Sequence, residues 1–248
     1  MSFPRDGSDD RAAPAREPPE VGALRAAGDV DGLVEALRGS DPEVARAAGR
    51  ALGRIDEPKA KAALATAFSE SRSFPAALGL AASRHPDAVA FLYERLSAAG
   101  SIDPEAREAA SAIAELRDPR SLGPLLEALR RAEGDEKRHY VHALGTLGDT
   151  RALPPLLGLM SLGVCETAIL EALGRIGDER ALGPLVRALK DERTDVCSAA
   201  IEALGALRDP RTEEFLRACL DRKDADPGMR LRVEHALASI AARDARST

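Results

Sequence analysis

Apolar side chains recur along this chain with the spacing of helices that are buried on one side. In the stretch 194–207, Val196, Ala200, Ala203 and Leu204 fall on one stripe of an α-helix, and Leu207 continues it. The opposite stripe comprises Ser198, Ala199, Glu202 and Ala206. The pattern therefore predicts a helix with one buried face and one face available to solvent or to a partner.

Close copies of the stretch 174–189, GRIGDERALGPLVRAL, occur before and after it. The aspartates of these copies are Asp118, Asp149, Asp178 and Asp209, so the steps between them are 31, 29 and 31 residues. A period near 30 with helical patterning is typical of a helical repeat array, in which each unit buries its apolar face against its neighbours. We therefore predict an all-α fold, an α-solenoid of about seven antiparallel helix pairs.

The expected organisation is a solenoid over 20–244 with a short polar segment at each end. Residues 1–19 hold too few large apolar side chains to fold alone, so we expect a disordered N-terminal tail. Residues 20–28 should form a capping helix, and 245–248 a C-terminal tail. The copy at 57–85 is the most degenerate, and the repeat register there stays open. The predicted pairs are 30–38 with 43–55, 59–69 with 74–83, 87–98 with 104–116, 119–131 with 135–147, 150–160 with 163–176, 179–190 with 194–207, and 210–222 with 228–242.

Composition favours closely packed helices and excludes several classes of protein. The chain is 44% hydrophobic, yet aromatic residues make up only 3% and Trp is absent, so Ala and Leu must carry the burial. A net charge of −6 argues against a nucleic-acid binder. No apolar run has the length of a membrane span or the pattern of a signal peptide. Three cysteines without CxxC spacing indicate reduced thiols, so we expect a cytoplasmic protein.

The pattern GDERALGPLVRALKD followed by ALGALRD resembles the HEAT-like repeats first described in phycobilisome lyases. The resemblance covers about 30–242. It implies a right-handed superhelix whose second helices line a concave side, where ligands usually dock. The family usually has Arg directly after the Val of the second helix, where this chain has Cys197, Glu166 or Ala45.

Each repeated aspartate is followed two residues later by an arginine. We interpret the aspartates as helix N-caps aligned in a ladder across the stack, because a catalytic residue should differ from its copies and none does. Proline follows five or six residues after each of the first three aspartates and should kink or restart the first helix of the pair. These prolines are Pro124, Pro154, Pro155 and Pro184.

No catalytic residue, cofactor or metal site is expected. His139 and His142 are three apart on one helix, but a metal site needs further ligands, and Glu171 is the only adjacent carboxylate candidate. Cys165 and Cys197 are interpreted as small buried residues. Deoxyhypusine hydroxylase, a di-iron enzyme built from similar repeats, carries paired His-Glu motifs on its second helices, and this chain has no His-Glu dipeptide.

Two further enzyme classes share this repeat type. A phycobilin lyase would need aromatic walls around a tetrapyrrole, for which only Phe74, Tyr140 and Tyr93 are candidates. An alkylpurine DNA glycosylase would need a basic groove with aromatic residues. We therefore favour a non-enzymatic scaffold that binds a protein partner along its concave face. The alternative is an accessory lyase-like or chaperone-like factor acting on a client protein.

The predicted partner surface follows from aligning every second helix on the stretch 194–207. Counting Glu108 and Glu115 as well, this face holds seven arginines and four glutamates, a net +3, whereas the whole chain carries −6. Arginine pairs bidentately with carboxylate and phosphate, so the partner is expected to be an acidic or phosphorylated segment. The candidate residues, here called the second-helix row, are Arg46, Arg50, Arg54, Arg107, Arg138, His139, His142, Glu171, Arg175, Glu202, Arg232 and His235.

Overall fold

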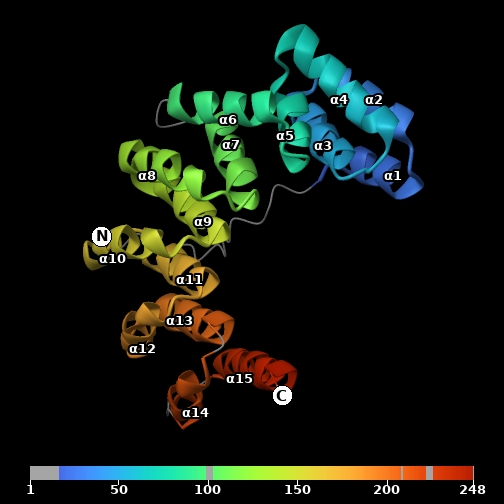
Figure 1. Ribbon diagram of the computed structural model, residues 1–248. Helices are drawn as coiled ribbons and strands as arrows, with labels where there is room; N and C mark the ends of the chain where they lie inside the picture. Colours follow the sequence, from blue (N-terminus) through green and yellow to red (C-terminus); the bar gives the residue numbers. More distant parts are fainter. Residues whose placement is uncertain (1–16, 99–102, 208, 222–225, 248) are drawn as a thin grey trace, which may run out of the picture. The chain divides into compact units, whose positions relative to one another are not determined.

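The computed structural model describes residues 17–98, 103–207, 209–221 and 226–247. Throughout the described residues the regular elements are helices: α1 stands alone and is followed by seven successive pairs (Figure 1). The α-solenoid predicted from the repeat is confirmed. The bounds are α1 Pro19–Ala27, α2 Val30–Arg38, α3 Pro42–Gly53, α4 Pro58–Ser71, α5 Phe74–Ala82, α6 Pro86–Ala98, α7 Pro104–Glu115, α8 Leu122–Arg131, α9 Lys137–Leu147, α10 Leu153–Ser161, α11 Glu166–Ile176, α12 Leu182–Ala188, α13 Thr194–Leu207, α14 Glu213–Leu220 and α15 Pro227–Ser247.

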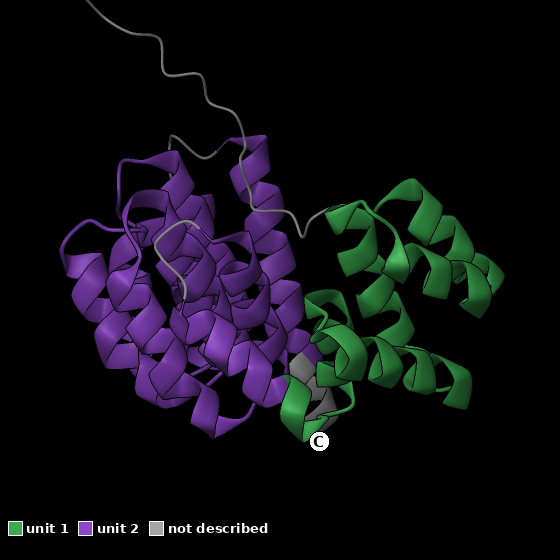
Figure 2. Ribbon diagram, turned by 90° about the horizontal axis from the view of Figure 1, so that it is seen from above, with its two compact units in different colours: residues 1–88 green, residues 89–248 purple. Residues whose placement is uncertain are grey.

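The chain divides into two compact units, unit 1 over Met1–Ala88 and unit 2 over Val89–Thr248 (Figure 2). In unit 1, α3 packs against α2, α4 and α5. In unit 2 the second helices α7, α9, α11, α13 and α15 each pack against the next, and α8, α10, α12 and α14 each pack against the second helix that follows them (Figure 1). The second helices of unit 2 therefore form one continuous layer.

The buried stripe predicted for the sixth pair is confirmed. Val196, Ala200, Ala203, Leu204 and Leu207 are all buried. Leu173, the equivalent of Leu204 in α11, is also fully buried.

One residue predicted on the open face of α13 is instead in the core. Ala199 is only 7% exposed. Because α13 is packed between α11 and α15, its buried sector is wider than a single stripe. The exposed positions on this face are Glu202 and Ala206, with Ser198 half-buried.

Close contacts through glycine join neighbouring second helices, as the ALG signature predicts. A Cβ atom on Gly174 would lie 2.7 Å from the Cα of Ala203, and one on Gly205 would lie 2.8 Å from the Cα of Ala236. Gly145 meets Ala172 in the same way. Real Cβ atoms do not approach backbone this closely, so glycine is required where these helices touch. The contact fixes the register between adjacent helices.

The last helix departs from this pattern because no second helix follows it in the described part of the chain. Two residues before the contacting alanine, α11 and α13 have the buried Leu170 and Ile201, whereas α15 has the exposed Glu234. Two residues after the alanine, the glycine is replaced by Ala238, which is exposed. The positions of α15 that correspond to the contact face of α11 and α13 are therefore exposed.

The first helices of pairs four to seven open with a short 3₁₀ turn. These turns are Pro119–Ser121, Thr150–Ala152, Glu179–Ala181 and Pro210–Thr212. The prolines that the sequence suggested would kink or restart the helix lie in the first turn of the α-helix that follows, as Pro154 and Pro155 do in α10. Backbone N–H groups have no intrahelical partner there, so proline costs no hydrogen bond. The restart is observed and the kink is not.

Several boundaries differ from those predicted. The second helix of pair five begins at Glu166 rather than at 163, because Gly163 and Cys165 adopt left-handed φ values of 73° and 51°. At the other end of unit 2, α15 runs on past the predicted 242 to Ser247. Most of the predicted N-terminal tail, residues 1–16, lies outside the described residues. None of the described helices has both the length and the apolar character of a membrane span.

Candidate binding surface

The second-helix row of unit 2 forms a ladder of polar contacts between neighbouring helices. Arg107 of α7 donates to Glu136 Oε1 at the base of α9, at 3.3 Å, and its Nη1 lies 3.5 Å from His139 Nε2. The Arg107 side chain is only 30% exposed. The first step of the ladder thus joins two predicted residues and one that was not predicted.

The ladder continues from α9 to α11. Arg175 Nη1 lies 3.0 Å from His142 Nδ1, and Arg175 Nη2 donates to Glu171 Oε2 at 3.2 Å. A guanidinium has no acceptor, so the imidazole of His142 must accept this hydrogen bond and must be neutral at Nδ1. Arg175 is therefore engaged by one imidazole and one carboxylate.

A third contact lies between α13 and α15, where Arg232 Nε is 3.4 Å from Glu202 Oε1. The remaining members of the row in unit 2 are Arg138, which is half-buried on α9, and His235, which is exposed on α15. Of the predicted residues, the structure thus places three groups in contact. They are Arg107 with His139, Arg175 with His142 and Glu171, and Glu202 with Arg232.

Both histidines of the ladder favour the neutral state. Burial, and then the positive charge of Arg107, lower the pKa of His139. Partial loss of hydration, followed by the charge of Arg175, lowers the pKa of His142, and His139 adds to the effect. Neutral imidazoles can accept from the arginines beside them, whereas imidazolium would repel these arginines.

The row in unit 1 has a different character. Arg46 and Arg50 are half-buried and Arg54 is exposed, and the three follow one another at intervals of four residues along the end of α3. Residues four apart lie on the same side of a helix, so they form a stripe. The neighbouring helix α5 packs closely on α3 and contains no charged residue between Phe74 and Ala82.

The positive excess of the row comes from unit 1 alone. In unit 2 the four arginines Arg107, Arg138, Arg175 and Arg232 are matched by four glutamates. These are Glu108, Glu115, Glu171 and Glu202. The difference of three arginines is contributed by Arg46, Arg50 and Arg54 of unit 1.

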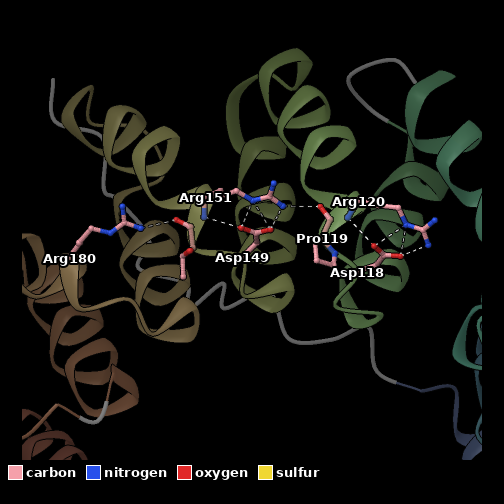
Figure 3. A network of polar contacts seen from close by, with 7 residues as sticks. Asp118, Pro119, Arg120, Asp149, Arg151 and Arg180 are labelled. Carbon is pink, nitrogen blue, oxygen red and sulfur yellow. Dashed lines mark hydrogen bonds and ion pairs between the residues drawn. The ribbon is translucent and has the colours of Figure 1, made fainter.

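The repeated aspartates are N-caps, as predicted. Asp149 accepts the backbone N–H of Arg151 at 2.9 Å and also the guanidinium of the same residue, and Asp118 does likewise with Arg120 (Figure 3). Asp178 and Asp209 make the same contacts with Arg180 and Arg211. Hydrogen bonds from Arg151 lower the pKa of Asp149. These aspartates therefore stabilise the start of each first helix.

The same arginines link successive repeats. Arg151 donates to the backbone oxygen of Pro119 at 3.2 Å, and Arg180 donates to that of Thr150 at 3.5 Å (Figure 3). Arg211 reaches Glu179 at the equivalent place, at 3.3 Å. An inter-repeat arginine network thus exists, but it comes from the turn before the first helix and not from the position after the Val of the second helix.

The cysteines and aromatic residues considered as candidates are buried or half-buried. Cys197 and Cys219 are buried, and Cys165 is half-buried with a pKa raised by burial. Of the aromatic candidates, Tyr140 is buried, and Tyr93 shares a 2.8 Å hydrogen bond with the buried Ser121. Phe74 is also buried. The described residues include no group of three or more side chains placed to hold a metal ion.

Glu136 is the member of the ladder that the sequence did not reveal. It lies at the end of a 3₁₀ turn, Gly134–Glu136, directly before α9. The alignment compared only positions within the second helices, so it did not include a residue of the preceding turn. Its position 29 residues after Arg107, close to the repeat length, is the signal that could have identified it.

Comparison with known families agrees with this arrangement. The model of HEAT repeats matches residues 30–103 and 166–246, and that of the PBS lyase HEAT-like repeat matches 106–131. No curated protein matches the chain.

Among solved structures, the complex of CpcE and CpcF of phycocyanin lyase from Nostoc sp. PCC7120 is similar, with 20% identity and a TM-score of 0.51, over 85% of this chain and 94% of that one. Human deoxyhypusine hydroxylase matches at 20% identity and a TM-score of 0.36, over 90% and 99% of the two chains. An engineered protein matches at 19% identity and a TM-score of 0.38, over 89% of this chain and 70% of the other. At these identities the first similarity supports the fold alone, and the other two carry no further weight.

Proposed function

Since this chain belongs to the family of HEAT-repeat proteins, we propose that it is a non-enzymatic scaffold that binds an acidic or phosphorylated segment of a protein partner along its second helices. The observation that carries the proposal is the arginine stripe of α3, formed by Arg46, Arg50 and Arg54 beside a helix without charge. Within unit 1, α3 is where such a segment would be recognised.

The neighbouring α5 contributes in two ways. It has only apolar and small residues from Phe74 to Ala82, so it adds no charge of its own to the arginine stripe. It also approaches α3 closely, since a Cβ on Gly53 would fall against the backbone of Gly79. The backbone beneath the stripe is therefore closely packed against α5.

The ladder of unit 2 is expected to contribute less to recognition of an acidic segment. Its arginines are engaged by side chains of the same face, so a ligand gains less charge attraction there than at α3.

The direct test uses the full chain and a fluorescent peptide of alternating glutamate and phosphoserine. Reversing Arg46, Arg50 and Arg54 to Glu should weaken binding, measured by fluorescence anisotropy, by at least about tenfold, because charge-assisted hydrogen bonds are lost. Raised salt should weaken the native complex. A matched control reverses three exposed arginines of first helices, Arg38, Arg130 and Arg187.

The control distinguishes a site from overall charge. If the control triple weakens the peptide as much as the α3 triple does, binding depends on net charge and the proposed site is wrong. Circular dichroism of each variant shows whether the helices are kept.

The match of residues 106–131 to the PBS lyase HEAT-like repeat brings forward a second candidate, a lyase-like factor that handles a bilin on a client. The burial of Phe74 and Tyr140 and the hydrogen bond of Tyr93 leave these aromatics unsuited to line a tetrapyrrole site, which favours the scaffold. Mixing the protein with a bilin and recording its absorbance separates the two. A stoichiometric shift of the bilin spectrum would support the lyase-like function.

A further inference from the structure

The connection between α10 and α11 is apolar and exposed, unlike its neighbours. Leu162 has 74% of its surface exposed, more than the other exposed large apolar residues of the described chain, Phe215 at 40% and Leu231 at 55%. Leu159, Met160 and Val164 lie beside it in sequence and are half-buried. Residues 159–165, here called the Leu162 turn, contain no charged residue.

Backbone hydrogen bonds hold the Leu162 turn in one shape. The N–H groups of Leu162 and Val164 both donate to the carbonyl oxygen of Leu159, at 3.0 and 3.2 Å, and that of Gly163 donates to Met160 at 3.0 Å. Gly163 has a left-handed φ of 73°, which glycine adopts without strain. The exposed leucine is therefore presented by an ordered turn, as an anchor for a partner requires.

The segments on either side of it carry exposed carboxylates. Glu133 and Asp135, between α8 and α9, are exposed, and so are Glu192, between α12 and α13, and Asp195, in the first turn of α13. These segments are close in space, because α9, α11 and α13 pack side by side in register. An ion pair between Arg193 and Glu166 joins the connection before α13 to the first residue of α11.

On the other side, Asp135 is near enough to Cys165 to act on its thiol. Burial, and then the negative charge of Asp135, raise the pKa of Cys165, while the charges of Arg138 and Lys137 act in the opposite direction. An apolar centre is thus bordered by carboxylates from both neighbouring repeats. Two of the nearby basic groups are engaged, since Arg193 pairs with Asp191 at 2.9 Å and Lys137 donates to the backbone oxygen of Leu129 at 3.2 Å, whereas Lys190 is exposed.

We propose that the Leu162 turn is a second docking surface, which receives a partner segment with an apolar side chain flanked by lysine or arginine. The apolar side chain would cover Leu162, and the basic side chains would meet Asp135 and Glu192. Burying a leucine that is now in water provides the driving force, and the carboxylate border selects for positive charge. A second copy of this chain is disfavoured as occupant, because a two-fold contact would set the acidic borders against each other.

This surface does not depend on the proposed role of α3, since it lies on different helices and selects the opposite charge. Its test therefore uses a different probe. The full chain is titrated with a short fluorescent peptide that carries two leucines between lysines. A second peptide has serine in place of the leucines, and a third has glutamate in place of the lysines.

We expect the lysine–leucine peptide to bind and both altered peptides to bind at least about tenfold more weakly. Leu162→Ser should weaken the lysine–leucine peptide by about tenfold or more, and the double change Asp135→Lys with Glu192→Lys should do the same. The matched control is Leu231→Ser, which removes an exposed leucine from α15 and should leave binding unchanged. Because Leu162 is exposed, its replacement should not unfold the protein.

Three results would overturn the proposal. One is that the lysine–leucine peptide does not bind, and another is that Leu162→Ser binds it as tightly as the native chain does. The third comes from sedimentation of the protein alone. If the native chain self-associates and Leu162→Ser abolishes this, a second copy occupies the surface.

Discussion

In unit 1 the helix packed on the arginines of the second-helix row carries no charge, whereas in unit 2 the row itself includes histidines and carboxylates. On α3, Arg46, Arg50 and Arg54 are neighbours of the uncharged α5. On α11, Arg175 meets His142 at 3.0 Å and Glu171 at 3.2 Å. The row thus holds three arginines and no glutamate in unit 1, and four of each in unit 2.

The packing beneath this face is shared by the two units. Gly53 of unit 1 and Gly174 of unit 2 both bring one second helix against the backbone of the next. Leu52, directly before Gly53, and Leu204, directly after the Ala203 that Gly174 contacts, are both fully buried. The comparison teaches that glycine and leucine set the stack, while the charged positions vary without disturbing it.

The largest effects should come from the shared core. Leu52→Ala and Leu204→Ala should each lower the free energy of unfolding by ~2–5 kcal/mol, because a buried leucine leaves a cavity. Chemical denaturation measures the loss, and hydrogen exchange assigns it to a unit. A loss below about 1 kcal/mol at one of the two positions would show that the units do not share this packing.

Somewhat smaller losses should follow from filling the glycine contacts. Gly174→Ala places a Cβ 2.7 Å from the Cα of Ala203, so the helices must separate, at a cost of ~1–3 kcal/mol. Gly158→Ala on α10 is the matched control. A Cβ there meets nothing within 4 Å, and alanine should stabilise the helix by up to about 1 kcal/mol. Thermal unfolding should thus move in opposite directions for the two variants, and equal shifts would contradict the close contact.

Features that lie within one repeat could be predicted from the sequence, whereas features that depend on contacts between repeats could not. Helix pairs, the buried stripe and the aspartate caps follow from periodicity within one repeat, so they were predicted. Ala199 was misplaced because burial on α13 depends on two flanking helices. The ladder partner Glu136 was missed because it depends on how a turn of one repeat lies against a helix of another.

One boundary error has a local cause. The start of α11 was predicted three residues too early, since a left-handed φ at Cys165 is unusual for a residue other than glycine. No sequence pattern considered above predicts such a conformation. Tertiary contacts around the turn must select it.

A smaller effect, confined to the ladder, is expected from pH. The pKa of His142 is lowered in the folded chain, so the unfolded chain takes up a proton first as the pH falls. The stabilisation is fully present above the ordinary histidine pKa of about 6.5 and is lost as the pH drops through the folded value. His142→Gln should flatten the decrease of stability between about pH 7 and pH 5. A slope that is unchanged in this variant would remove the ladder as its cause.

The unequal charge of the second-helix row in the two units is tested most directly by following the arginine side chains in NMR spectra. The Nε–Hε resonances of the full chain are recorded while the glutamate–phosphoserine peptide is added. We predict dose-dependent shifts at Arg46, Arg50 and Arg54, with Arg107, Arg175 and Arg232 nearly unmoved. Shifts at the ladder arginines while those of α3 stay fixed would contradict the account.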